Sequence, residues 1–508
     1  MGFIDNIIAA FSPEAAYRRE AYRQAYDWLR NYDAGNYDRP NQNWRATNQS
    51  ADVTDRYSRD DVKARARDLE RNSDIMNSVS GAFKRNVVGG GFRVQAKTEE
   101  TDLNKEIEKA WKRWCKKQNC DVTGRQSLNQ IIRMAVERKK IDGGILFVKR
   151  YTKDGFVPFK LQMIETDELD SGTIWPKHKG NKVVGGIEYN SWNRPVGYFI
   201  KQYDIDGYGQ KEPVWVDAKD VIFYFTIRRP TQLREMSDMA QTIPRIRDIT
   251  EFMTAVSVKQ RIEACLAVFI EKGLPVTGVG RGNHASNETR NSYEGKLLSP
   301  GMIKELNQGD KVQVVNPTGQ GADATSFTKL QQRLVGAGQG ISYEATSRDM
   351  SEATYSSARQ GMIEDDLTYG EEKELLLEVL DEIYETFIIS AVLCGALSIP
   401  HFWEEKERYL SHEWTQEPRP WIDPQKESNA DSTALKTGQK TFKQIAAENG
   451  RDWRDQIDDM AEVLEYGEEK GVDMKSIIFG IKEAENEEPG DDDEGSDGKE
   501  KPKPKDKG

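Results

Sequence analysis

Cysteine and histidine are scarce in this chain of 508 residues, which contains four of each. Only Cys115 and Cys120 lie close together, and no histidine or further cysteine is near them. Structural zinc sites take four Cys or His ligands at short spacings, and catalytic zinc helices carry an H-E-x-x-H pattern, which is absent here. The sequence therefore predicts no metal site and argues against redox chemistry.

Long apolar runs are also missing. The longest nearly uncharged apolar stretch covers Phe387 to Ile399, thirteen residues, and a membrane-spanning helix needs about 20. Residues 1–11 lack the positive end and the long apolar core of a signal peptide. We therefore expect no membrane segment and a protein made and kept in a reducing cytoplasm.

A phosphate-binding loop is absent as well. Gly-Lys pairs occur only at Gly295-Lys296 and Gly498-Lys499, and neither is followed by Ser or Thr. The G-x-x-x-x-G-K-[ST] loop that cradles nucleotide phosphates is therefore missing. Acidic pairs such as Glu371-Glu372 stand in segments dense with charge, where a solvated helix face is the ordinary interpretation. The sequence predicts no catalytic residues and no cofactor.

Basic residues do not exceed acidic ones: 73 Lys and Arg stand against 85 Asp and Glu, a net charge of −12. Residues 483–508 carry eleven acids and five lysines, a net −6, and the remainder carries 68 basic and 74 acidic residues, also −6. A near-neutral, slightly acidic body does not hold duplex DNA by counterion release, as a sequence-reading protein does. It can still surround DNA without binding it tightly.

Aromatic residues are plentiful, with 17 Phe, 19 Tyr and 11 Trp, which is too many for a disordered chain. Helical periodicity predicts helices over residues 12–30, 59–86, 102–114, 243–270, 327–335 and 355–397, and two or three helices over 423–471. Residues 31–52 indicate a mobile arm, and residues 401–424 are predicted to be mostly extended.

Strands are predicted between Gly143 and Ile227, where short aromatic or β-branched runs alternate with Gly, Asn and Asp turns. These runs are ILFVKR, FKLQMIE, GGIEYN, PVGYFIKQYD, EPVWV and VIFYFTIRR, and FRVQAK at 92–97 precedes them. Asp204 to Gly207 is interpreted as a hairpin turn rather than a calcium loop. The fold class predicted is α+β, with an antiparallel β-rich module between helical segments.

Two segments are rich in glycine. Residues 272–326 combine Gly, Asn and Pro around a hairpin-like core at 296–317. Gly336 to Gly340 indicate a break between two helices, followed by a polar loop, which together form a flexible projection between two rigid helices. An ordinary helix–helix connector is the alternative interpretation.

Several stretches of the chain, taken in order, resemble the lambda-type family of tailed-phage portal proteins. The most specific is GISYEATSRDMSEATYSSAR at 340–359. The others are RARDLERN with VVGGGFRV within 65–94, DGGILFVKR with QMIETDELD within 142–170, GIEYNSWNRPVGYFI at 186–200, RRPTQLREMS at 228–237, and the later run from Trp421 to Trp453. Ordered matches over roughly 400 residues are far more specific than one short motif.

The resemblance implies a portal fold with a mixed α/β wing, long stem helices, a small β-containing clip and a helical crown. It implies the following division: N-terminal helix and mobile arm 1–58, wing 59–242, stem helix 243–271, clip 272–326, returning stem helix 327–341, tunnel loop 342–354, long inner helix 355–400, wing and crown region 401–482, and disordered acidic tail 483–508.

The resemblance also implies a function without catalysis. Such subunits form a ring, typically a dodecamer, at one vertex of the capsid in the virion, after assembly in the host cytoplasm. The ring is the channel through which double-stranded DNA enters and leaves. Implied partners are the terminase large subunit, the major capsid or scaffold protein and the head–tail adaptor.

The candidate site residues follow from the same resemblance. Those of the tunnel loop that would line the DNA channel are Tyr343, Thr346, Ser347, Arg348, Asp349, Ser351, Glu352 and Thr354, followed by the motif residues Tyr355, Ser356, Ser357 and Arg359. Those of the clip that would dock the terminase are Arg281, Asn283, His284, Arg290 and Tyr293. Two alternatives stay open: a packaging-associated nuclease, and a minor head or adaptor protein that binds the ring.

Overall fold

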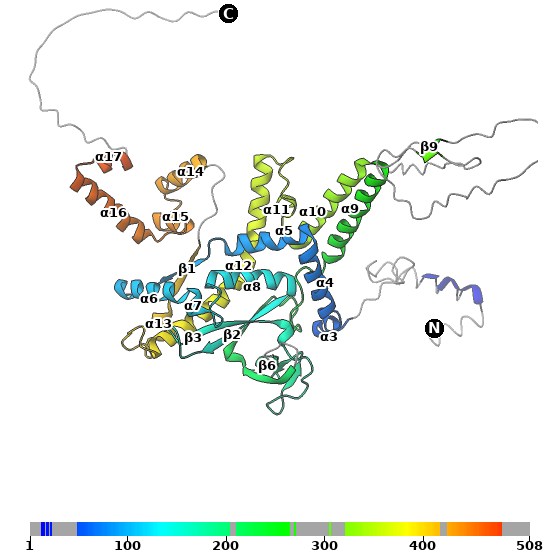
Figure 1. Cartoon of the computed structure of the whole chain (residues 1–508), viewed down its shortest axis with the longest axis horizontal. Helices are drawn as coiled ribbons and strands as arrows, with labels where there is room; N and C mark the ends of the chain where they lie inside the picture. The colour runs from blue at the N-terminus through cyan, green and yellow to red at the C-terminus, as the bar shows by residue number, and fades with distance from the viewer. Residues whose placement is uncertain are drawn as a thin grey trace, which may run out of the picture.

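The computed structural model describes residues 12–15, 17–19, 21–22, 48–203, 210–264, 269–270, 304–305, 321–416 and 424–479. The fold is α+β, as predicted, with a central β-region covered by helices, a projecting helical hairpin and a separate group of C-terminal helices (Figure 1).

The helices up to the hairpin are α3 Ala51–Asp55, α4 Arg59–Asn72, α5 Asp74–Phe83, α6 Thr101–Trp114, α7 Lys117–Cys120, α8 Leu128–Asp142 and α9 Ile243–Ala264. Those after it are α10 Gly321–Gln339, α11 Tyr343–Ser347, α12 Tyr355–Leu393, α13 Lys406–Leu410, α14 Pro424–Lys436, α15 Phe442–Glu448, α16 Trp453–Lys470 and α17 Met474–Phe479. The strands are β1 Phe92–Ala96, β2 Gly144–Tyr151, β3 Phe159–Glu165, β4 Lys182–Val184, β5 Ile187–Tyr189, β6 Pro195–Tyr203, β7 Gln210–Asp217, β8 Val221–Phe225, β9 Phe269–Ile270, β10 Lys304–Glu305 and β11 His412–Gln416.

The central sheet has the order β3-β2-β8, and both of its pairings are antiparallel. Because side chains alternate along a strand, β2 contributes to two cores. Ile145 and Phe147 join the helical core, whereas Leu146 and Val148 join a second cluster. That second cluster packs against the four-stranded antiparallel sheet β4-β5-β6-β7. The result is three layers: helices, central sheet and outer sheet.

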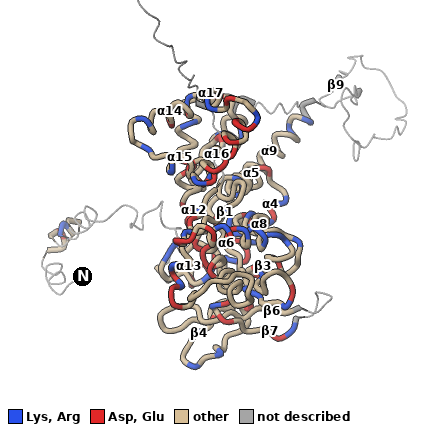
Figure 2. Tube along the Cα trace, turned by 90° about the vertical axis from the view of Figure 1, so that its left-hand side faces the viewer, with Lys and Arg blue, Asp and Glu red and all other residues tan. Residues whose placement is uncertain are grey.

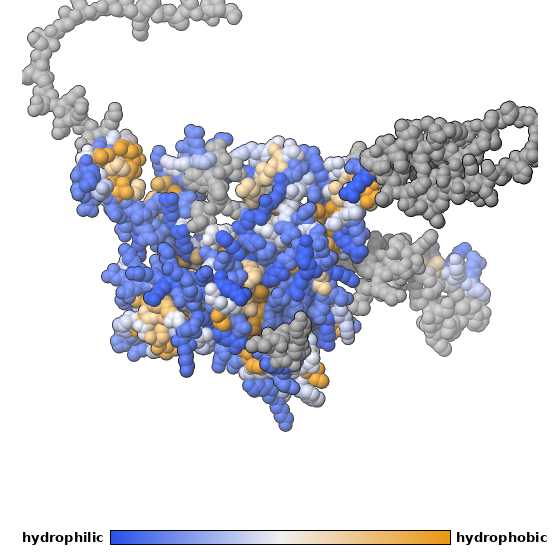
Figure 3. All heavy atoms as spheres, in the orientation of Figure 1, coloured by the Kyte–Doolittle hydropathy of each residue, from blue (hydrophilic) through white to orange (hydrophobic). Residues whose placement is uncertain are grey.

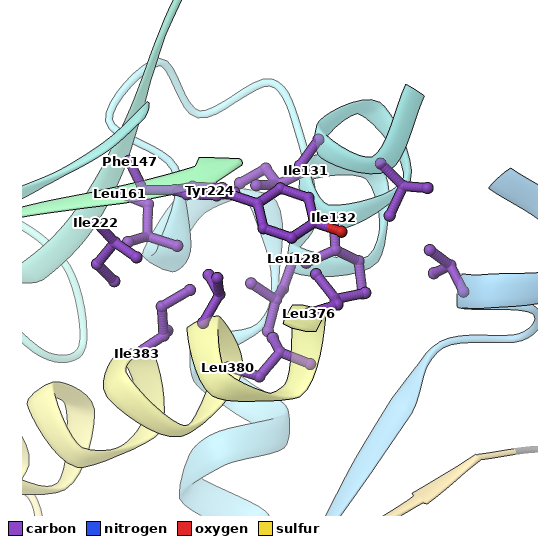
Figure 4. Close-up of a cluster of buried hydrophobic side chains, with 14 of the residues drawn as sticks. Leu128, Ile131, Ile132, Phe147, Leu161, Ile222, Tyr224, Leu376, Leu380 and Ile383 are labelled. Carbon is purple, nitrogen blue, oxygen red and sulfur yellow. The ribbon is translucent and has the colours of Figure 1, made fainter. Parts of the chain in front are cut away.

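The helical layer is built on α8 and α12. Figure 4 shows the apolar side chains of the central sheet meeting those of both helices, with Tyr224 of β8 beside Leu376 and Leu380 of α12. Trp111 of α6 packs edge-on against Phe387 of α12, with ring centroids 5.2 Å apart. The second half of α12 is therefore the central rod of the body, and its first half leads to the candidate site.

Strand β11 lies beside β1, the first strand that the structure describes. It pairs antiparallel with β1, so Val94 lies opposite Trp414 although the two are far apart in sequence. This pairing joins the C-terminal end of the body to β1, which packs on α6.

Most of the predicted elements are confirmed. The helix at 102–114 and the runs of strands between 143 and 227 are present, and β6 and β7 pair antiparallel as a hairpin around residues 204–209, which lie outside the described residues. The described residues within 12–30 are helical at 13–15, 17–19 and 21–22. Two or three helices were expected over 423–471, and α14, α15 and α16 are found there.

Several predicted boundaries are wrong. The arm predicted for 31–52 ends earlier, because Ala51 and Asp52 are buried in α3, where the Ala51 N–H bonds Thr231 Oγ1. Residues 401–424 were predicted to be mostly extended but include the helix α13. The long helix ends at Leu393 rather than near 397–400, because the chain turns at Gly395, whose φ of +76° suits glycine.

The hairpin region also differs from its prediction. The stem helix does not continue to Ile270, because Phe269–Ile270 is a strand that pairs in parallel with Lys304–Glu305. A hairpin was predicted within 296–317. The strand pairing that the structure describes in this region instead joins 304–305 to 269–270. Residues 321–326 belong to α10, which starts before the predicted clip ends. The other clip residues lie outside the described residues.

Candidate functional site

The candidate site is the chain that leaves α10 and returns as α12, and it begins with a glycine turn. Gly340 has a φ of +69° and ends α10. The next residue, Ile341, is buried, and its N–H bonds the Gly336 carbonyl at 3.0 Å. This arrangement satisfies a free carbonyl at the helix end and seals the turn with an apolar contact.

The predicted glycine-rich break begins later than expected, because α10 continues through Gly336 and Gly338 to Gln339 and the chain turns at Gly340. Tertiary packing explains the presence of Gly336 and Gly338 inside a helix. A Cβ on Gly336 would lie 2.7 Å from both Ile341 O and Thr346 Oγ1, and one on Gly338 would lie 2.9 Å from Thr242 Cγ2. The glycines let the loop and the start of α9 approach the α10 backbone closely, which outweighs their low helix propensity.

The short helix α11 is fixed to α12 by one buried carboxylate. Ser342 caps α11, accepting from the Ala345 N–H at 3.2 Å. Ser342 also donates to Asp365 twice, from its N–H to Oδ1 at 2.6 Å and from its Oγ to Oδ2 at 2.7 Å. Asp365 is only 5% exposed, so these charge-assisted bonds are shielded from water. The first part of the loop is therefore anchored rather than free.

The second part of the loop is a polar turn held by contacts with α10. Arg348 has a φ of +59°, an unfavourable region for a side chain of this size. Tyr343 Oη donates to Asp349 at 3.2 Å, and the hydrogen bonds from Ser351 hold the pKa of Asp349 below its usual value. Lys329 of α10 pairs with Glu352 at 2.6 Å, and this bond raises the pKa of Lys329.

The predicted residues of the tunnel loop divide by exposure. Thr346 is 1% exposed and donates to the Ser342 carbonyl, so it shapes the loop. Ser347 is partly buried and bonds the Tyr343 carbonyl and the Asp349 N–H. The exposed side chains that the structure brings together at the tip are those of Arg348, Met350, Ser351, Glu352 and Thr354.

The start of α12 contacts the C-terminal helices. Thr354 and Ser357 form a reciprocal cap, which confirms a helix start at this motif. Arg359 pairs with Glu427 of α14 at 3.8 Å, and Lys426 Nζ lies 5.2 Å from the Tyr355 ring centroid. The structure thus brings together two stretches that the sequence comparison had singled out separately.

A buried ionic cluster at the base of the α9–α10 hairpin was missed by sequence reasoning. Asp238 is 3% exposed and lies 3.1 Å from Lys139 of α8 and 2.9 Å from Arg228. Lys139 and Lys140 also contact Glu372 of α12. Gln339, the last residue of α10, donates to the Asp238 carbonyl at 3.1 Å. The cluster therefore joins the body, the hairpin and the long helix.

Two arginine side chains, Arg85 and Arg348, lie near each other at the tunnel loop. Burial and the nearby Arg348 guanidinium lower the pKa of Arg85, which projects from the π-helical turn Lys84–Val88. The expected terminase-docking residues, which are Arg281, Asn283, His284, Arg290 and Tyr293, lie outside the described residues. In the part of the chain that the structure describes, no group of His, Cys, Asp or Glu is arranged to hold a metal ion.

Membrane insertion has no candidate segment among the described residues. No helix there combines the length and the apolar character needed to cross a bilayer.

Comparison with known proteins identifies the class. The chain is 24% identical over 449 residues to a probable portal protein of Halomonas phage phiHAP-1, covering 85% of this chain and 86% of that protein. It is 19% identical over 435 residues to portal protein B of Escherichia phage lambda, covering 77% and 81%. It is 20% identical to the portal protein of Escherichia phage N15, covering 81% and 85%.

A family model agrees with these relatives. It is described as phage portal protein, lambda family, and matches residues 37–372, about two thirds of the chain. The chain belongs to the lambda family of phage portal proteins, and the resemblance seen in its sequence is confirmed.

Solved structures give weaker likenesses. A subunit from the virion of a native gene transfer agent particle is 13% identical, with a TM-score of 0.38, over 74% of this chain and 90% of that one. A subunit from the neck of an empty particle, computed with C6 symmetry, is 14% identical, with a TM-score of 0.40 and the same coverage. At TM-scores below 0.5 these likenesses carry no argument about this chain.

Proposed function

We propose that this portal protein forms a closed homo-oligomeric ring, a dodecamer in the assembled virion, whose channel passes double-stranded DNA without binding it tightly. Membership of the portal family supports the proposal. So does the charge, because a near-neutral, slightly acidic remainder outside residues 483–508 does not favour tight binding of phosphates. In this proposal the chain acts without catalysis, and a separate motor supplies the energy.

The tunnel loop is the segment we assign to the channel wall, and one observation carries this assignment. The loop is anchored at its base by Asp365 while Arg348, Ser351 and Glu352 stay exposed at its tip. A loop that touches moving DNA needs a fixed base, so that its tip keeps one position, and polar side chains that make only weak, screened contacts with phosphates.

The remaining partners follow from the family. We propose that the clip docks the terminase large subunit during packaging and a head–tail adaptor afterwards, and that the wing contacts the major capsid or scaffold protein. The ring would assemble in the host cytoplasm and remain at one vertex of the virion. The acidic residues 483–508 would repel packaged DNA at distances within a screening length, about 8 Å at physiological salt.

Sedimentation and native mass measurement of the purified chain test the ring. The expected result is one closed species of many subunits at micromolar concentration and physiological salt. Monomers alone, over a broad range of concentration and salt, would contradict the proposal and favour an adaptor that binds a ring made by another protein.

A further inference from the structure

The C-terminal helical unit, residues 424–479, has almost no core of its own. Between 424 and 478 the buried residues are Ala446, Gly450 and Gly467, none larger than alanine. By contrast, α12 alone buries eleven residues, among them Tyr384 and Phe387. Four helices without a large buried side chain cannot offset the conformational entropy that folding costs. The unit therefore needs to bury apolar side chains against another surface in order to be stable.

The body of the same chain does not supply it. The contacts between the unit and the body include two ion pairs at 3.8 Å, Arg359 to Glu427 and Lys105 to Asp458, in addition to the contact of Lys426 with the Tyr355 ring. Exposed pairs of this kind contribute about 0–1 kcal/mol each. Between them, a groove of about 1420 Å³ separates α14 and α15 from α12 and β11. Figure 1 shows the unit standing apart from the layered body.

One face of α16 combines acidic groups with an apolar centre. At 3.6 residues per turn, Asp459, Glu462 and Glu465 fall within roughly 120° of the helix circumference. Figure 2 shows acidic residues along α16, and none of these three forms an ion pair with another described residue. Tyr466, 59% exposed, lies inside the arc, and Val463, 44% exposed, lies beside it.

Among the described residues, the helices α14 and α15 carry unpaired charge of the other sign. Lys436, Lys443 and Arg451, on and after α14 and α15, are exposed and form no ion pair within the described part of the chain. Leu435, next to Lys436, is 44% exposed and gives these helices an apolar centre too. Figure 3 shows further apolar residues on the surface of the unit, where Ile477 is 69% exposed.

We propose that the acidic face of α16 docks on the basic edge formed by α14 and α15 of a second copy of this chain. Two different faces of one subunit that fit each other give a head-to-tail contact, which forms a ring when the rotation between copies closes. An apolar centre with a charged rim is the usual anatomy of such a contact. The inference rests on the proposed ring and adds that the C-terminal unit becomes stable only when neighbouring subunits meet.

Hydrogen exchange on the full-length chain tests this. Amides of 453–470 should exchange quickly in a dilute monomer fraction and at least about tenfold more slowly in the assembled fraction. Equal exchange in both fractions would overturn the inference while leaving the ring in place. A chain that never assembles would overturn the ring and this inference together.

Charge reversal tests which faces meet. Lys436→Glu with Lys443→Glu, or Asp459→Lys with Glu462→Lys, should each remove the protection of 453–470 in the assembled fraction, and the fourfold variant should restore it. A control pair, Lys179→Glu with Lys182→Glu, makes the same change in net charge as Lys436→Glu with Lys443→Glu, on exposed residues far from 424–479 in the sequence, and should have no effect. A fourfold variant no better protected than either pair would overturn the assignment of the two faces.

Discussion

Ser342 and Asp365 join the tunnel loop to the long helix through two hydrogen bonds from one residue to one carboxylate. The backbone N–H of Ser342 reaches Oδ1 at 2.6 Å and its hydroxyl reaches Oδ2 at 2.7 Å. Because Asp365 lies ten residues after the start of α12, the position of the loop is set by the helix that also forms the centre of the body. Movement of α12 would be transmitted directly to the loop.

Asp365→Ala should free the loop. Loss of two bonds to a buried carboxylate should cost about 2–3 kcal/mol of unfolding free energy and speed hydrogen exchange in residues 342–347. Thermal unfolding and exchange measurements check both effects. Glu364→Ala, at the exposed neighbouring position, is the control and should change stability by less than about 0.5 kcal/mol. If the two variants behave alike, Asp365 does not anchor the loop.

Two glycine substitutions should change the stability of the chain in opposite directions. Gly336→Ala places a Cβ 2.7 Å from the Ile341 carbonyl and should destabilise the chain by about 1–3 kcal/mol. Gly370→Ala, in the middle of α12 with nothing within 4 Å of its Cβ, should stabilise it by up to about 1 kcal/mol. Denaturant unfolding of both variants gives the comparison. A stabilising Gly336→Ala would show that the α10 glycines are not needed for packing.

Glu108 should make the contact between α6 and α16 sensitive to pH. Burial, together with Asp455 and Asp452, raises the pKa of Glu108 above its usual value of 4.5. The hydrogen bond donated by the Ala96 N–H lowers this pKa but does not cancel the increase. The folded state therefore binds this proton more readily than the unfolded state, and the ionised carboxylate reduces stability as the pH rises through the folded-state pKa.

Glu108→Gln isolates this effect. The variant should be more stable than the unmodified chain at pH 8, and the difference should shrink toward pH 4.5, where Glu108 itself becomes protonated. Thermal unfolding at several pH values measures the difference, with exposed Glu106→Gln as the control. A difference that stays constant with pH would rule out this role for Glu108.

Removal of residues 281–293 should separate assembly from docking. The deletion takes out all five expected clip contacts, Arg281 and Tyr293 among them, while the described body is untouched. Ring formation should persist and packaging of DNA by the terminase should fall. Normal packaging by the deletion variant would show that the terminase docks elsewhere.

Local patterns predicted most elements correctly but not how they meet. The short aromatic or β-branched runs of β2 and β8 identified strands because composition and flanking turn residues are local properties. The anchoring of Ser342 by Asp365 and the helical state of Gly336 depend on close packing between segments that no local pattern relates. The same holds for Asp238, whose partners come from α8, α12 and the approach to α9. The sequence pointed to the tunnel loop through family resemblance, and only the structure separates its buried residues from its exposed tip.

The position of Ser351 in the assembled particle tests the central claim most directly. A heavy-atom cluster would be attached to Ser351→Cys in a chain whose Cys265 and Cys394 are replaced by Ser. The control is the same label on Ser171→Cys, an exposed position in the region proposed to be the wing. Averaged images down the ring axis should place the Ser351 label at the central channel and the Ser171 label toward the outside. A Ser351 label at the periphery, or particles without a central channel, would contradict the assignment of the tunnel loop to the DNA path.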